Sequence, residues 1–280
     1  PSTVDGQMSS FSSWGPTDGL TLKPEITGIG GNVFSAYLSG FATASGTSMS
    51  SPAVAASATL VRQYLETTNL EESEIAHVVN CLLMSTATPI RDEAHNTLYF
   101  VRRQGAGMAN PAAAISSGAY IQVAGTNKAK LELGDDPQKT GVYDMTFEVV
   151  NFSDQDKTYT LDTTVLGQVA QGGRIVNGEV TYLTFDYARE LEVDTTCSAQ
   201  GGKVTVPANS KVEVHVTVTL PDAERAYLEE RFPYGSYVEG FVQLLSEETP
   251  SLSVPFLAFY GDYGAAPVVE EGTYETLVSD

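Results

Sequence analysis

The stretch Gly46-Thr47-Ser48-Met49-Ser50-Ser51-Pro52 decides how the first part of this chain folds. It follows a short run, Tyr37 to Ser45, and opens a series of small and apolar residues from Ala53 to Leu65, which predicts a helix that begins near Ser48. Free backbone N–H groups and the positive end of the helix dipole would then lie beside the serine oxygen. Because such a field stabilises the negative charge on an attacked carbonyl oxygen, Ser48 is a candidate nucleophile for acyl transfer.

The residues around the serine suit a turn into a helix, but a second interpretation stays open. Gly46 lets the backbone turn without a steric penalty, and Pro52 is tolerated where it falls in the first helical turn. Serine is also among the residues preferred at helix starts, so Ser48 alone would equally suit a helix cap. The complete seven-residue motif favours the nucleophile.

The motif has the form Gly-Thr-Ser-Met-x-x-Pro and resembles the serine motif of subtilases, the subtilisin-like serine proteases. The site residues that this resemblance implies are the nucleophile Ser48, the oxyanion turn Gly46, Thr47 and Ser48, and the substrate-binding residues Ser39, Gly40 and Ser45. The resemblance implies no metal or organic cofactor for this chain. Subtilases often bind structural calcium, but no Asp-rich loop of ligand spacing stands out here.

The flanks of the motif also resemble subtilases. Phe11–Pro16 and Lys23–Thr27 are similar to the strand-loop-strand before the serine, and Gln104–Pro111 is similar to the turn into the last helix of the catalytic domain. Two departures stand out. Gly28-Ile29-Gly30 replaces the usual Ala-Pro-Gly, and Ala53 stands where many relatives carry a non-catalytic histidine.

The other members of a catalytic triad do not precede the serine. Subtilase triads run Asp, His, Ser along the chain, whereas all three histidines here, His77, His95 and His215, follow Ser48. We expect His77 to be a solvated helix residue, His95 to lie in a surface loop, and His215 to face away from the core of a strand. The general base, its orienting carboxylate and the oxyanion-hole amide are therefore expected in an upstream part of the same polypeptide.

Composition excludes some partners. The formal net charge is -20, from 35 acidic and 15 basic residues, which would repel nucleic acid and anionic membranes. No stretch approaches 18 apolar residues, so we expect no membrane insertion. The two cysteines, Cys81 and Cys197, cannot form a disulfide framework, and Cys81 is expected to pack as a small apolar residue. Many extracellular bacterial proteases lack disulfides.

Two architectures are predicted within the chain. Residues 1–117 mix short strands with helices at Ser48–Leu65 and Asn69–Ser85, which fits an α/β fold, the C-terminal part of a subtilisin-like parallel-sheet domain. Residues 118–262 show alternating apolar and polar residues, as in Val142–Val150 and Lys211–Leu220, which predicts an antiparallel β-sandwich. A polar helix is expected at Asp222–Arg231. We expect this second part to fold alone, and residues 263–280 to be a linker toward further modules.

The second part resembles the fibronectin type III-like module behind the catalytic domain of lactocepin-type cell-envelope proteinases and related complement peptidases. Val204–Ser210 and Tyr237–Val242 carry that likeness. The resemblances imply a bacterial, extracellular or cell-surface serine endopeptidase that hydrolyses peptide bonds of proteins. Two alternatives remain open at this point. One is a non-catalytic adhesion or interaction fragment with a β-sandwich, and the other is a serine-carboxyl peptidase, which uses Glu and Asp partners.

Overall fold

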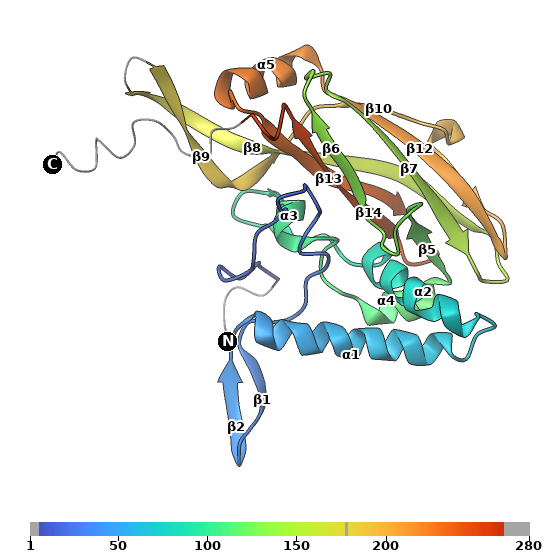
Figure 1. Cartoon of the computed structure of the whole chain (residues 1–280). Coiled ribbons are helices and arrows are strands. Elements are labelled where there is room, and N and C mark those ends of the chain that lie inside the picture. Colours follow the sequence, from blue (N-terminus) through green and yellow to red (C-terminus); the bar gives the residue numbers. More distant parts are fainter. Residues whose placement is uncertain (1–5, 177–178, 266–280) are drawn as a thin grey trace.

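The computed structural model describes residues 6–176 and 179–265 (Figure 1). Of the expected linker 263–280, the residues from 266 onward lie outside the described residues. The first part contains β1 (Val33–Tyr37), β2 (Gly40–Ala44), α1 (Thr47–Leu65), α2 (Glu72–Ser85), β3 (Arg91–Asp92), β4 (Thr97–Leu98), α3 (Val101–Gln104) and α4 (Pro111–Ser117). No helix in the described ranges combines the length and apolar composition that a bilayer crossing needs.

The predicted helices of the first part are present. α1 buries only Val61 and Leu65 completely, and these two residues pack with Ile75, Val78 and other residues of α2 in one hydrophobic cluster. Cys81 is buried in the same cluster, as expected for a small apolar side chain. α1 is therefore fully buried only near its C-terminal end, whereas the residues of its first turns are partly or largely exposed.

The expected parallel sheet is absent from the described residues of the first part. Phe11–Pro16 and Lys23–Thr27 are not strands, and the only parallel pairing there is an isolated bridge between Thr27 and Met108. The two short sheets of this part, β1–β2 and β3–β4, are antiparallel. The expected mixture of helices and strands is present, but the parallel sheet is not, because a parallel ladder needs neighbouring strands that the described residues of this part do not supply.

The second part consists almost wholly of strands. It contains β5 (Ala119–Gln122), β6 (Leu131–Asp136), β7 (Val142–Asn151), β8 (Lys157–Val176), β9 (Glu179–Glu190), β10 (Asp194–Cys197), a 3-10 turn (Gln200–Gly202), β11 (Lys203–Val206), β12 (Ser210–Thr219), α5 (Asp222–Arg231), β13 (Ser236–Leu245) and β14 (Leu252–Tyr260). α5 is the polar helix expected from the sequence. The strands form two sheets, in the orders β10-β12-β7-β5 and β11-β8-β13-β14-β6, with β9 paired to β8.

One pairing departs from the antiparallel expectation. β14 pairs with β6 in parallel, whereas the other neighbours in both sheets are antiparallel. The alternation of β7 is as predicted, because Tyr143, Met145, Phe147 and Val149 are all buried. These side chains share one hydrophobic cluster with residues of the other sheet, such as Val238.

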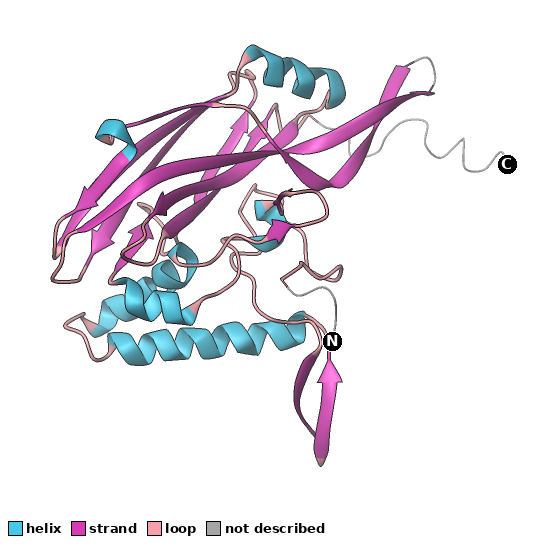
Figure 2. Ribbon diagram, turned by 180° about the vertical axis from the view of Figure 1, so that it is seen from behind, coloured by secondary structure: helices cyan, strands magenta, loops and turns pink. Residues whose placement is uncertain are grey.

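The first part covers the outer face of the second sheet. β14 is buried at every residue from Leu252 to Tyr260, which an ordinary half-exposed strand would not be. A hydrophobic cluster joins Phe241 and Leu257 of this sheet to Phe100 and Val101 beside α3. Figure 2 shows the helices of the first part gathered below one end of the strands of the second part. The two parts therefore share their hydrophobic core.

Candidate active site

The serine motif begins the longest helix of the structure. α1 starts at Thr47, so Ser48 is its second residue, and Gly46 is the N-cap with a φ of 158°. The carbonyl of Gly46 accepts hydrogen bonds from the N–H groups of Met49 at 3.0 Å and Ser50 at 3.4 Å. Ser48 is exposed, and the first N–H groups of a helix have no intrahelical acceptor. The predicted position of the serine at a helix start is thus present in the structure.

Pro52 does not lie in the first helical turn, contrary to the expectation. It is the sixth residue of α1 and sits inside the helix. Proline has no N–H, so the carbonyl of Ser48 lacks the donor that a residue four positions later normally supplies. The helix begins earlier than it would if Pro52 lay in its first turn, because its N-cap is Gly46 and not Ser48.

The residues predicted to border the substrate cleft are separated in the structure. β1 and β2 form a hairpin in which Tyr37 pairs with Gly40, so Ser39 and Gly40 lie at its turn. Ser45 lies at its base, where the Ser45 Oγ accepts a hydrogen bond from the N–H of Asn32 at 2.8 Å. A five-residue strand spans roughly 16 Å, so the tip and the base of the hairpin are far apart. Figure 1 shows the hairpin standing away from the body of the protein.

The hairpin also carries exposed aromatic side chains. The rings of Phe34 and Phe41 stack with their centroids 5.6 Å apart, and both side chains are largely exposed. Tyr37 and Leu38 at the tip are exposed as well. This apolar surface, made by Phe34, Tyr37, Leu38 and Phe41, has no counterpart packed against it among the described residues.

Two glycines bring a neighbouring segment close to the serine turn. The carbonyl of Gly30 accepts a hydrogen bond from the N–H of Gly46 at 2.9 Å. A Cβ atom at Gly30 would lie 2.8 Å from the Gly46 oxygen, and one at Gly28 would lie 2.6 Å from the side chain of Val54. The departure Gly28-Ile29-Gly30 is therefore explained by close packing on α1. The glycines at these two positions are the feature of the sequence that could have indicated how closely this segment approaches α1.

A cavity of about 940 Å³ lies beside the serine turn. Ser45, Thr47 and Ser50 line it, together with parts of the segments 6–13 and 24–32. Ser48 is not among its lining residues. Among the described residues no three His, Cys, Asp or Glu side chains gather as a metal site requires.

None of the histidines hydrogen-bonds to Ser48 within the described part of the chain. The Nε2 of His77 lies 3.0 Å from Oε1 of Gln122, and this histidine is half-buried rather than solvated as expected. His215 is exposed and contacts Thr146 and Glu213. Both rings therefore contact side chains other than Ser48, and the expectation that neither is the base stays a prediction.

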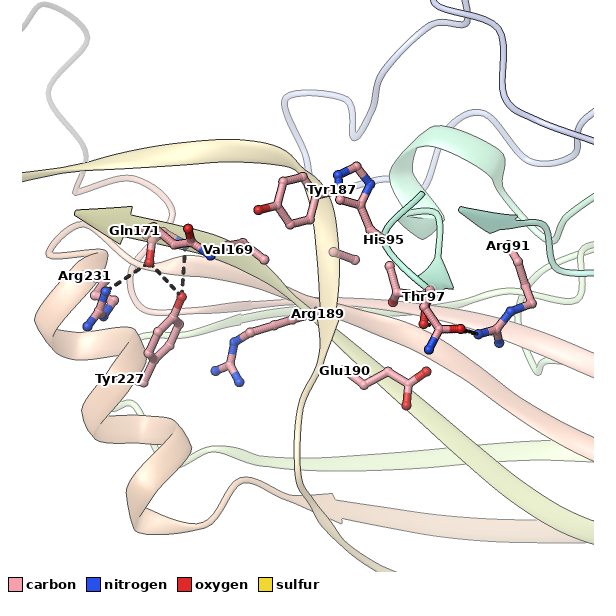
Figure 3. Close-up of a pocket in the computed structure, with 13 residues that line it drawn as sticks. Arg91, His95, Thr97, Val169, Gln171, Tyr187, Arg189, Glu190, Tyr227 and Arg231 are labelled. Atoms are coloured by element: carbon pink, nitrogen blue, oxygen red, sulfur yellow. Dashed lines mark hydrogen bonds between the residues drawn. The ribbon is translucent and has the colours of Figure 1, made fainter. Parts of the chain in front are cut away.

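His95 lines a second cavity, of about 740 Å³, that the sequence did not predict (Figure 3). Its Nδ1 lies 2.8 Å from Oδ2 of Asp92, and its ring stacks on Tyr187 with centroids 3.8 Å apart. Tyr227 and Arg231 of α5 face it from the other side of the cavity. The cavity joins the β3–β4 hairpin, the β8–β9 hairpin and α5, which are distant in sequence. No local pattern could therefore have indicated it.

Comparison with known proteins assigns both parts of the chain. Residues 2–107 match the subtilase family, and residues 131–257 match the Fn3-like domain family. The subtilase match covers most of the first part, and the Fn3-like match covers most of the second. Both resemblances stated from the sequence are confirmed at this level, and the subtilase segment contains the whole serine motif.

The relatives of this chain are proteinases of bacteria. It is 29% identical over 282 residues to the PI-type proteinase of Lactococcus lactis subsp. cremoris, a match that covers 95% of this chain and 14% of that protein. It is 28% identical over 281 residues to the C5a peptidase of Streptococcus pyogenes, covering 99% of this chain and 22% of that protein. The chain thus spans less than a quarter of the length of these relatives. Both matches run through the subtilase segment and the Fn3-like domain.

Proposed function

We propose that this chain is the nucleophile-bearing part of a serine endopeptidase, with Ser48 as the nucleophile. The observation that carries the proposal is the exposed position of Ser48 as second residue of α1, two residues after the N-cap Gly46, within a segment that matches the subtilase family. Helix N–H groups at this place suit a developing oxyanion. The turn Gly46–Ser48 would supply that oxyanion site, with the N–H of Ser48 as a donor.

In the proposed reaction the Oγ of Ser48 attacks the carbonyl carbon of a peptide bond. A histidine takes the serine proton and later gives it to the leaving amine, while an aspartate orients the histidine. These two groups would come from a part of the polypeptide outside this chain, because the histidines present are engaged elsewhere. Ser45 would contact substrate next to the nucleophile, and Ser39 and Gly40 would do so from the tip of the hairpin.

The second part would be a two-sheet β-sandwich that supports the catalytic part. We place the domain boundaries at residues 1–117 and 118–262, with 263–280 as a linker toward further modules. The shared hydrophobic cluster of the two sheets supports the sandwich. The names of the relatives, a proteinase and a peptidase, support protein substrates. We further propose a place outside a bacterial cell or on its surface.

Activity-based labelling of a longer polypeptide that contains this chain tests the nucleophile. The Ser48→Ala variant should lose both proteolysis and reaction with a fluorophosphonate, whereas Ser51→Ala, three residues further along the same exposed helix start, should keep both. Loss of one triad member costs on the order of 10⁴ to 10⁶ in turnover in this class. Retained activity in Ser48→Ala would refute the assignment. The present chain alone should not label, and rapid stoichiometric labelling of it would show that its base is internal.

A further inference from the structure

Glu25 lies at the centre of a cluster of lysines. Its Oε1 is 3.0 Å from the Nζ of Lys23 and 3.2 Å from that of Lys130, and its Oε2 is 3.0 Å from the Nζ of Lys128. The Glu25 side chain is 18% exposed and that of Lys130 is 7% exposed. Burial by itself raises the pKa of Glu25, but the hydrogen bonds from the three lysines outweigh it and lower the pKa to about 2. The carboxylate is therefore charged and held from both oxygens at neutral pH.

Two of these lysines come from the second part of the chain. Lys128 and Lys130 stand directly before β6, more than a hundred residues from Glu25 in sequence. Lys130 also donates to the carbonyl of Leu22 at 3.3 Å and pairs with Glu132 at 2.9 Å. An ammonium group that is nearly buried is tolerated only when it is paired. Lys130 therefore depends on its contacts with Glu25, Glu132 and the carbonyl of Leu22.

The backbone of Glu25 continues directly to the serine turn. The carbonyl of Glu25 accepts a hydrogen bond from the N–H of Ala106 at 2.9 Å. Two residues further on, the N–H of Thr27 donates to the carbonyl of Gly107 at 2.9 Å. The same short segment then reaches Gly30, whose carbonyl binds the N–H of Gly46 at 2.9 Å. No regular sheet holds this segment. Its further contacts are the bridge between Thr27 and Met108 and the hydrogen bond that the Thr27 carbonyl accepts from the N–H of Ala109 at 2.9 Å.

We propose that Lys128 and Lys130 are positioning residues for the Ser48 turn. They clamp Glu25, and through the segment 25–30 they hold Gly30 against Gly46 at the start of α1. Their consequence for catalysis rests on the proposed function of Ser48, whereas the clamp itself is a property of this chain. The second part of the chain would thereby set the geometry of a site to which it contributes no catalytic residue.

Hydrogen exchange in the chain itself tests the clamp without any activity. In the Lys128→Met/Lys130→Met variant, the Gly46 amide should exchange about tenfold faster or more, because the local opening of its hydrogen bond becomes easier. Amides in the centre of β13 should keep their rates, which separates loss of position from loss of global stability. Lys128→Arg/Lys130→Arg should restore slow exchange at Gly46. Lys211→Met, which removes an exposed lysine paired with Glu148, is the matched control.

An unchanged Gly46 exchange rate in the Met variant would overturn the proposal. If that variant does not fold, Glu25→Gln removes the charge with the same shape, and the same amide is read. In the longer polypeptide, the Met variant should lower kcat about tenfold with KM little changed, since ground-state contacts to substrate stay in place. Failure of the nucleophile assignment would appear instead as activity in Ser48→Ala, and that outcome would leave the exchange result intact.

Discussion

Arg102 and Glu239 form a buried ion pair across the junction of the two parts of the chain, with 3.0 Å between Arg102 Nη1 and Glu239 Oε1. Their side chains are 7% and 0% exposed. The N–H of Arg102 also donates to Oε2 of Glu239 at 2.8 Å, and the rings of Phe100 and Tyr237 each lie 4.3 Å from the guanidinium carbon. Glu239 of β13 thus pairs with the guanidinium of Arg102 and also accepts a hydrogen bond from its backbone N–H in α3.

Replacement of Glu239 by glutamine should strongly destabilise the protein. The variant keeps the shape but leaves the guanidinium of Arg102 buried without a countercharge, which costs about 3–5 kcal/mol when one partner of such a pair is removed. Urea unfolding measures the loss. Glu213→Gln on β12, whose side chain is 57% exposed, should change stability by less than about 0.5 kcal/mol. Equal effects of the two substitutions would mean that the buried pair is not special.

Glu25 should make the stability of the chain depend on pH below neutrality. Its folded pKa of about 2 lies below the usual unfolded value of about 4.3, so the unfolded state binds the proton first. The contribution, up to about 3 kcal/mol, is therefore present above pH 4.3 and lost as the pH falls toward 2. The stability difference between the natural chain and E25Q should shrink over this window. A difference that stays constant from pH 5 to pH 2 would contradict the expected shift.

Alanine at Gly30 should disturb the serine turn. The added Cβ would lie 2.8 Å from the Gly46 oxygen and 3.1 Å from the Ser50 Cβ, so the backbone must move. We expect a loss of about 1–3 kcal/mol in stability, typical of overpacking. Gly31→Ala is the control, because its Cβ would meet only the Ser9 Oγ at 3.4 Å. Thermal unfolding of the two variants compares them, and a neutral Gly30→Ala would show that the turn can relax.

The second part alone should be less stable than the chain as a whole. Phe241 and Leu257 pack against Phe100 and Val101, so residues 118–262 without the first part would expose this apolar face. We expect a lower melting temperature and binding of a hydrophobic dye by the isolated segment. The expectation that this part folds alone stays a prediction, and the same experiment tests it. An unchanged melting temperature without dye binding would show that the shared core is dispensable.

The hairpin should drive association of the chain in solution. Phe34 and Phe41 are 69% and 72% exposed, and Leu38 at the tip is 93% exposed. Contiguous exposed apolar surface of this kind tends to be buried by association. Light scattering should find a concentration-dependent increase in mass, which Phe34→Ser/Phe41→Ser should reduce. A monomer over the whole concentration range would contradict this expectation.

Local patterns in the sequence determined several elements of this protein without reference to the rest. The motif at Ser48 predicted the start of α1, alternation in Val142–Val150 predicted β7, and polar helix-compatible composition predicted α5 at Asp222–Arg231. Each of these depends on residues close in the chain, because helix and strand periods are local properties.

Only the tertiary structure decided which distant segments meet. The parallel pairing of β14 with β6, the burial of both faces of β14 and the contact of Lys130 with Glu25 all join residues far apart in the sequence. Periodicity does not encode such partners, since the free energy of a long-range contact depends on the whole packing arrangement. For the same reason the sequence could indicate Ser48 as a candidate nucleophile, whereas the residues proposed to hold its turn in place became visible only in the folded chain.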